Sequence, residues 1–360
     1  MSRPHPARST LSRRAFGSAV VASSLALVAA CGGSSGDDTA TPAASGSTGA
    51  AAAAFPVSID HKYGTTEVTA APQRIVVVGL TEQDALLALG VVPVATTKWF
   101  GENPGEIWPW AKEKLGTAAV PQTLTDTDGI QFEKVAALKP DLIVGMYSGL
   151  TKEDYATLSK IAPTLAQPAG VTDFGVGWDV VTQTVGKAVG KAGEADKIVA
   201  DTKALFTAAT AAHPTFKGAS ALFATTYEGY YVYGPEDARG RFLQSLGFVL
   251  PPDLASITGK DFGANISKER IDLLDTDVLV WLVDDYAKDK ATVQNDPLYA
   301  ALKVKKEGRD VFLTNAEELG TASSFVTVLS LPFLLDGLVP QLAEAIDGNP
   351  ATPVVPATPS

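Results

Sequence analysis

The sequence predicts an α/β fold built from two similar lobes that one long helix joins. From Phe55 onward, short β-branched runs alternate with amphipathic stretches, a pattern typical of α/β proteins. Two sequence patterns of the first half return in the same order in the second half. A helical pattern without a break lies between the halves, over residues 193–212.

The first half is expected to alternate strands with helices. The expected elements are a strand over residues 74–79, a helix over 82–89, a strand over 91–95, a helix over 132–138 and a strand over 141–144. Gly90 marks the end of the first helix, because glycine adopts the left-handed conformation that commonly ends helices. Pro140 ends the second, because proline lacks the N–H group that a helix interior needs.

The second half repeats this rhythm after the central helix. The expected elements are a strand over residues 221–225, helices over 242–246 and 268–274, strands over 278–283 and 311–313, and a helix over 329–346. The central helix ends at Pro214 and would span about 30 Å. We interpret it as a rigid strut between two lobes; the alternative is an ordinary crossover helix inside one domain.

An internal repeat indicates that the two lobes are built alike. Residues 133–144 and 269–280 both read Glu-basic-β-branched-x-x-Leu-x-x-Asp followed by three aliphatic residues. Residues 86–91 likewise match residues 242–248 with one insertion. One such match could arise by chance, but two in the same order favour a divergent repeat.

The N-terminal thirty residues are expected to be an export signal. Four arginines and no acid precede a short apolar run, and Arg13-Arg14 resembles the twin-arginine motif, although a general export signal also begins with basic residues. Val28-Ala29-Ala30-Cys31 resembles a lipobox, in which the cysteine becomes the lipidated first residue. Residues 32–54 are a low-complexity tether that would reach about 25–30 Å as a flexible coil.

Composition excludes several classes of protein and of site. The chain has 29 basic and 40 acidic residues, and without the first thirty residues the balance is 25 to 40, a net charge of −15. Nucleic-acid binding is therefore not expected, because phosphate contacts need a basic surface. The single cysteine, Cys31, excludes an intrachain disulfide and a cysteine-based cluster. With only His61 and His213 left after export, we expect no directly bound metal and no intrinsic cofactor.

The chain resembles the substrate-binding proteins of bacterial iron–siderophore, haem and vitamin B12 importers. The stretches that carry the resemblance are residues 72–78, 86–90, 133–144, 232–235, 266–270 and 295–299. It implies two Rossmann-like lobes with a ligand between them, an ABC permease and ATPase as partners, and a lipid anchor at Cys31. Together with the patterns above, this predicts a signal peptide (1–30), a lipidated linker (31–54), an N-terminal lobe (55–192), a backbone helix (193–214), a C-terminal lobe (215–347) and a tail (348–360) whose Pro/Thr-rich composition indicates disorder. We expect the protein to be a monomer.

Six side chains are candidates for the ligand site, because they lie on or near loops that follow predicted strands, where open α/β sheets bind ligands. They are Trp99, Tyr147, Tyr227, Tyr231, Arg239 and Arg241. Rings would pack on a chelator skeleton while guanidinium groups contact its anionic oxygens, so a ferric siderophore fits the set. Tyr231, like Tyr233, could instead be strand packing, and Arg239 and Arg241 could be solvated or cap the following helix. Trp178 is expected in the core.

The ligand class is narrowed by one departure from the family pattern. Catecholate binders often carry a basic residue after the strand equivalent to 278–283, whereas this chain has Asp284-Asp285-Tyr286. A hydroxamate, mixed or citrate-type chelate is therefore favoured. Haem and cobalamin remain alternatives within the same fold. An enzyme is disfavoured, since a Gly-x-Ser-x-Gly elbow and a P-loop are missing from the sequence, and a non-transport envelope protein is the third possibility.

Glu133 and Glu269 occupy matching places in the repeat, each in the first turn of an expected helix. A carboxylate there gains about 0.3–1 kcal/mol from the helix dipole, which is a sufficient structural reason for it. The resemblance implies a second role, because one exposed glutamate on each lobe docks onto arginines of the permease in this family.

Overall fold

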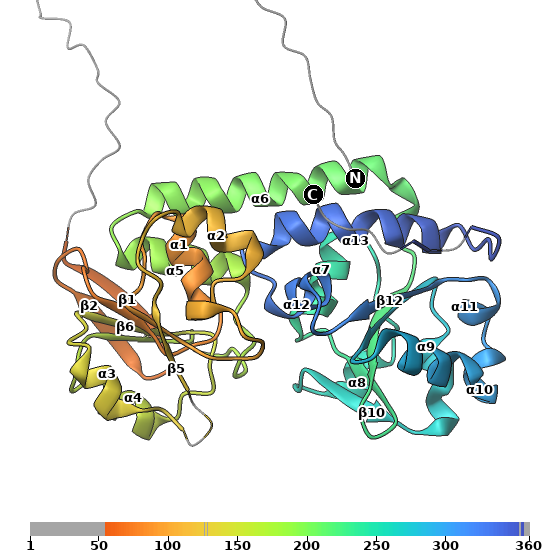
Figure 1. The fold of residues 1–360 in the computed structure, drawn as a ribbon, viewed down its shortest axis with the longest axis horizontal. Helices are drawn as coiled ribbons and strands as arrows, with labels where there is room; N and C mark the ends of the chain where they lie inside the picture. The colour runs from red at the N-terminus through yellow and green to blue at the C-terminus, as the bar shows by residue number, and fades with distance from the viewer. Residues whose placement is uncertain (1–54, 126, 128, 353, 356–360) are drawn as a thin grey trace, which may run out of the picture. The chain divides into compact units, whose positions relative to one another are not determined.

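The computed structural model describes residues 55–125, 127, 129–352, 354 and 355. Arg13, Arg14, Cys31 and the tether at 32–54 lie outside the described residues, so the predictions about export and lipidation are not addressed by it. Within the described part, no helix is both long enough and apolar enough to cross a membrane. Two sheets and their helices form the two lobes, and α6 (Ala192–Ala212) runs along both (Figure 1).

The N-terminal lobe contains a parallel five-stranded sheet with the strand order β5-β4-β3-β6-β7. Its strands are β3 (Ile75–Val77), β4 (Ala95–Thr97), β5 (Gln122–Leu124), β6 (Leu142–Gly145) and β7 (Thr164–Ala166), and an antiparallel hairpin, β1 (Val57–His61) and β2 (Gly64–Val68), precedes them. The prediction of a strand at 91–95 was wrong by several residues. Pro93 cannot donate to the ladder, and pairing begins only at Val94, whose N–H bonds to the Ile75 carbonyl.

Helices cover both faces of this sheet. They are α1 (Glu82–Ala88), α2 (Pro109–Leu115), α3 (Phe132–Ala137), α4 (Lys152–Leu158) and α5 (Trp178–Ala188), with a short 3₁₀ turn, η1 (Pro104–Glu106). The central strands are apolar on both sides because both sides are covered. Val77 and Val144 pack with Leu86 in one core cluster, and Val76 and Ile143 belong to another.

The C-terminal lobe has a mixed sheet with the order β10-β9-β8-β11-β12. Its strands are β8 (Ala221–Thr226), β9 (Tyr230–Tyr233), β10 (Gly263–Ile266), β11 (Val278–Val283) and β12 (Asp310–Thr314), with β9 antiparallel to both neighbours. Its helices are η2 (Pro214–Phe216), α7 (Ala238–Ser245), α8 (Leu254–Thr258), η3 (Lys268–Leu274), α9 (Tyr286–Asn295), α10 (Pro297–Ala300), α11 (Lys303–Lys306), α12 (Glu318–Phe325) and α13 (Ser330–Ile346).

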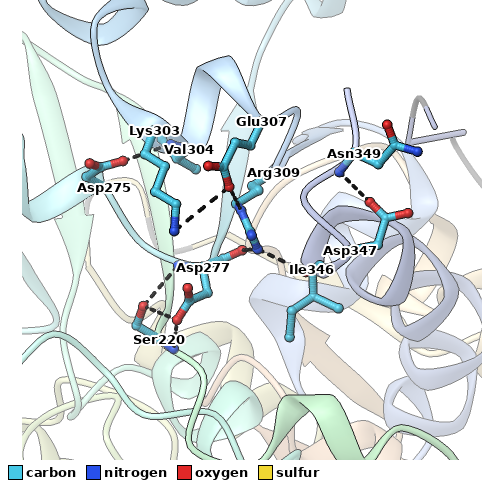
Figure 2. Close-up of polar contacts among 10 residues, drawn as sticks. All are labelled: Ser220, Asp275, Asp277, Lys303, Val304, Glu307, Arg309, Ile346, Asp347 and Asn349. Carbon is cyan, nitrogen blue, oxygen red and sulfur yellow. Dashed lines mark hydrogen bonds and ion pairs between the residues drawn. The ribbon is translucent and has the colours of Figure 1, made fainter. Parts of the chain in front are cut away.

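The internal repeat places an aspartate just before a central strand of each lobe, and the two aspartates make similar hydrogen bonds. In the N-terminal lobe, the Asp141 carboxylate accepts hydrogen bonds from the Gln73 and Arg74 N–H groups, at 2.7 and 2.8 Å, just before β3. In the C-terminal lobe, Asp277 accepts from the Ser220 N–H group at 2.8 Å, just before β8 (Figure 2). The repeated aspartate therefore fixes the start of two adjacent strands in each lobe.

Arg309 connects the last residue of α13 to the end of the sheet at which β8 and β11 begin. Its Nη1 donates to the carbonyls of Asp277, at 3.2 Å, and Ile346, at 2.9 Å, while its Nε lies 2.6 Å from Glu307 (Figure 2). In the segment that follows, Val354 packs on the core of this lobe and the Val355 N–H bonds to Glu344 at 2.9 Å. The disorder expected for residues 348–360 stays a prediction.

Helix α6 belongs to both cores. Ala195 is buried in the cluster of the N-terminal lobe, and Phe206, three turns later, is buried in that of the C-terminal lobe. The apolar side chains at helical spacing thus face one lobe at the start of the helix and the other at its end. This confirms the predicted α/β fold of two lobes joined by one long helix.

A second connection crosses between the lobes where α12 meets α13. Phe325 packs its ring 4.6 Å from Trp99 and 5.2 Å from Trp108 of the N-terminal lobe. Two residues later, the Thr327 hydroxyl donates to the buried Asp84 carboxylate of α1. The segment from Phe325 to the start of α13 therefore packs in the N-terminal lobe, which the division of the sequence at residues 193–214 did not anticipate.

Candidate functional site

The carboxyl ends of β3 and β6 define where the N-terminal lobe can bind a ligand. These strands are neighbours, yet the chain continues from β3 to β4 on the opposite side, so the loops after them diverge and leave a crevice. The loop after β3 contains Thr81, and the loop after β6 contains Tyr147. Both residues line an interlobe cavity of about 420 Å³.

A buried carboxylate, Glu82, shapes this crevice. Its Oε1 accepts from the N–H groups of Met146 and Tyr147, at 2.5 and 2.8 Å, and its Oε2 accepts from the Thr81 N–H at 3.0 Å. Burial raises the pKa of Glu82, and the backbone donors oppose that rise. A Cβ atom at Gly79 would collide with the carboxylate, so only glycine fits there. Both loops are thus held by one side chain.

Tyr147 is the point at which the two lobes face each other. Burial raises its pKa to about 12, and Asp237 of the C-terminal lobe adds to the rise. Arg239 and Arg241 act on the same pKa in the opposite direction, so the phenol lies within electrostatic range of both guanidinium groups across the lobe boundary, and Arg241 lines the same cavity as Tyr147. The Trp99 ring lies 6.1 Å from that of Tyr147. Four of the six predicted side chains therefore gather here.

Arg239 is positioned by groups of its own lobe. It lies in the first turn of α7, where the Asp237 carboxylate caps the helix by accepting from the Arg239 N–H at 2.8 Å. Its guanidinium carbon sits 3.8 Å from the centre of the Tyr233 ring, and its side chain is 13% exposed. Its buried Nε has no hydrogen-bond partner among the described residues, although a carboxylate oxygen of Asp237 lies 3.5 Å away.

The other predicted site residues do not all lie near Tyr147. Tyr231 contacts the Tyr233 ring at 5.3 Å and so extends the same aromatic surface. Tyr227, at the turn between β8 and β9, is 62% exposed and takes part in none of the ring contacts of the described residues. Glu133 and Glu269 are exposed at the starts of α3 and η3.

The cavity extends from Tyr147 to the underside of α6. Arg241 lines it beside Phe242 of α7. Trp178, which we expected in the core, packs partly buried against the core of the C-terminal lobe and also lines the cavity at the start of α5. The Arg241 Nη1 donates to the Glu236 carbonyl at 2.5 Å, and within the described part of the chain Arg241 forms no ion pair. A guanidinium group without a carboxylate partner is thus presented to an interlobe space.

Sequence reasoning missed the groups that join the lobes. Phe174, after β7, contacts Tyr147 at 5.9 Å and Phe262 of the other lobe at 6.2 Å. Neither phenylalanine directly follows a central strand. The search for side chains on loops after predicted strands therefore did not find them. Phe325 was missed for the same reason. Glu82, a carboxylate at the start of the helix expected over residues 82–89, is a sequence signal that could have pointed to the crevice.

The comparisons with known proteins agree with this architecture. A sequence profile of the periplasmic binding protein family matches residues 75–317, which is more than half of the chain. The chain belongs to this family. Members of the family and the relatives described next are binding proteins and not enzymes.

Three relatives show what this periplasmic binding protein is similar to. The crystal structure of PiaA from Streptococcus pneumoniae, in complex with ferrichrome, is 28% identical with a TM-score of 0.72 and covers 81% of this chain and 99% of PiaA. The Fe(3+) dicitrate-binding periplasmic protein FecB of Escherichia coli is 27% identical over 262 residues, 69% of this chain and 79% of FecB. YfiY of Bacillus subtilis, a probable siderophore-binding lipoprotein, is 28% identical over 298 residues, 77% of this chain and 87% of YfiY.

Proposed function

We propose that this protein is a lipid-anchored receptor that captures a ferric siderophore between its lobes and delivers it to an ABC permease and ATPase. The observation that carries the proposal is Arg239. Its guanidinium is nearly buried, stacked on Tyr233 and within electrostatic range of Tyr147 of the other lobe, and its Nε forms an ion pair with Asp237 at 3.5 Å but no hydrogen bond with the described residues. Such a cation is suited to the anionic oxygens of a chelate, because charge-assisted hydrogen bonds are stronger in a site of low dielectric constant.

The charge around Arg239 favours a chelate of moderate charge. Arg239 and Arg241 are opposed by Asp237, and Asp284 is close enough to raise the pKa of Tyr233. A strongly anionic tris-catecholate would meet these carboxylates. A hydroxamate or citrate-type chelate fits better, and the ligands named for PiaA and FecB, ferrichrome and ferric dicitrate, belong to these two classes.

Binding can be tested on the chain that begins after Cys31. Trp99 and Trp178 lie at the site, so their fluorescence should be quenched when ferrichrome, ferric citrate or another ferric chelate binds. Arg239→Met should weaken binding about 10- to 100-fold, since it removes charged hydrogen bonds, and Arg239→Lys should weaken it less. Binding of haem or cobalamin in place of every ferric chelate would overturn the proposal.

Docking to the permease is assigned to Glu133 and Glu269. They are exposed, they occupy matching places in the repeat, and each is the second residue of a helix that leads into a central strand of its lobe. A hydrogen bond from the Ser267 side chain lowers the pKa of Glu269, which keeps it charged at neutral pH. Glu133→Lys with Glu269→Lys should abolish import while chelate affinity stays unchanged. Normal import by the double variant would exclude this assignment.

Membrane attachment is assigned to Cys31, with export through the segment containing Arg13-Arg14. The lipobox-like sequence supports it, as does the similarity to YfiY, whose name includes lipoprotein. Cys31→Ser should release the protein from the membrane fraction and prevent incorporation of labelled palmitate. An unchanged membrane fraction would show that another segment holds the protein at the membrane.

A further inference from the structure

The turn between β8 and β9 carries an exposed tyrosine, Tyr227, that does not line the interlobe cavity. Tyr227 is the most exposed of the large apolar side chains among the described residues, at 62%. The next residue, Glu228, has a φ of 50°, a backbone conformation that residues other than glycine rarely adopt. Packing within the C-terminal lobe does not explain why this strained turn exposes a tyrosine to solvent.

The base of the turn is rigid. Tyr230, the first residue of β9, pairs with Thr226 of β8 and also with Ile266 of β10. Its hydroxyl donates to Asp296 at 3.0 Å, and its ring lies 5.5 Å from that of the buried Trp281. Tyr227 and Glu228 therefore project from a fixed support.

The same pairing places the turn between the two functional surfaces of the lobe. Because Tyr230 pairs with Ile266, the turn at 227–229 lies at the end of β10 from which Ser267 leads to Glu269. In the other direction along β9, Tyr231 begins the aromatic surface that reaches Arg239. The turn that carries Tyr227 therefore lies beside the start of η3, which carries Glu269, on the strand that also leads to the surface around Arg239.

We propose that the Tyr227-Glu228 turn is a second contact of the C-terminal lobe with the permease, next to Glu269. This inference rests on the proposed function. The recognised surface combines an apolar ring with two carboxylates, Glu228 and Glu269, so the partner surface is cationic with an apolar recess that accepts the ring. Tyrosine is enriched among residues that dominate binding energy at interfaces. The described N-terminal lobe has no exposed aromatic side chain of this size beside Glu133, so the anchor lies on one lobe only.

The test measures two affinities on the full-length protein. One is the affinity of the chelate-loaded protein for its permease and ATPase in lipid nanodiscs, and the other is the affinity for the chelate itself. Tyr227→Ser should weaken the first about tenfold or more and leave the second within about twofold. Glu228→Lys should weaken the first as well, more strongly at low salt than at high salt. Val249→Ser is the matched control, because Val249 is 48% exposed at the opposite end of β8 and should change neither affinity.

Two results would overturn this inference. If Tyr227→Ser lowers chelate affinity more than twofold, Tyr227 is a ligand residue, as the sequence predicted. If both affinities stay unchanged, the turn contacts neither partner. The Glu133→Lys, Glu269→Lys variant separates these results from a failure of the proposed function: when it loses docking and Tyr227→Ser does not, only the present inference fails. When the unaltered protein does not bind the importer, the proposed function fails.

Discussion

Replacing Asp84 with asparagine should stabilise the folded protein at neutral pH. The Asp84 carboxylate is fully buried where α1 meets the segment before α13. Its Oδ2 accepts from the Trp110 indole at 2.8 Å and from the Thr327 hydroxyl, while its Oδ1 has no partner among the described residues. Burial raises the pKa of Asp84 to about 6 from 3.8, although these two hydrogen bonds act against the rise.

The size of the effect follows from that pKa. One unit in pKa corresponds to about 1.4 kcal/mol, so keeping Asp84 ionised costs the folded state about 3 kcal/mol. Because the folded pKa is higher than the unfolded one, the folded protein binds more protons between about pH 4 and pH 6, and stability falls as the pH rises through that window. Asparagine resembles the protonated side chain in carrying no charge, and its carbonyl oxygen can accept from Trp110 and Thr327 as Oδ2 does. The free energy of unfolding should rise by about 2–3 kcal/mol at neutral pH.

Urea unfolding followed by circular dichroism, at several pH values from about 4 to about 7.5, measures this difference. The gain should be largest at the highest pH and should disappear near pH 4. Glu113→Gln, a carboxylate-to-amide change at an exposed position of α2, is the control and should show no such trend. A difference that is the same at every pH, or a loss of stability at neutral pH, would refute the reasoning about Asp84.

Two further substitutions test other buried polar groups. Glu82→Gln should destabilise the protein by about 2–3 kcal/mol and weaken chelate binding, because both carboxylate oxygens accept backbone N–H groups and an amide nitrogen must oppose one of them. Urea unfolding and fluorescence titration would measure both effects, and an unchanged chelate affinity would show that the loop at Tyr147 does not need this anchor. Arg309→Met should lower stability by about 1–3 kcal/mol, since it leaves two carbonyls without their donor and Glu307 with only its longer ion pair to Lys303, at 3.9 Å, with chelate affinity unchanged. A stability equal to that of the unaltered protein would show that water replaces the guanidinium.

Local patterns in the sequence determined the architecture. The β-branched runs form β3, β6, β8 and β11 in the structure. The helix predicted over residues 193–212 is α6, which begins one residue before the predicted start. The repeated Glu-to-Asp pattern predicted two similar lobes. In each lobe its aspartate, Asp141 or Asp277, accepts a backbone hydrogen bond just before a central strand. These features are readable because periodicity and strand ends depend on residues close together in the chain.

Which side chains meet between the lobes was decided only by the tertiary structure. Asp84 and Thr327 are 243 residues apart, and nothing around either residue predicts the other. Tyr147 and Arg239 could be named as candidates because each lies near a strand end, but their proximity depends on how α6 and the segment around Phe325 set one lobe against the other. Tyr227 met the same rule and points to solvent, because the direction of a turn depends on the pairing of β9 with β8 and β10 and not on its own sequence.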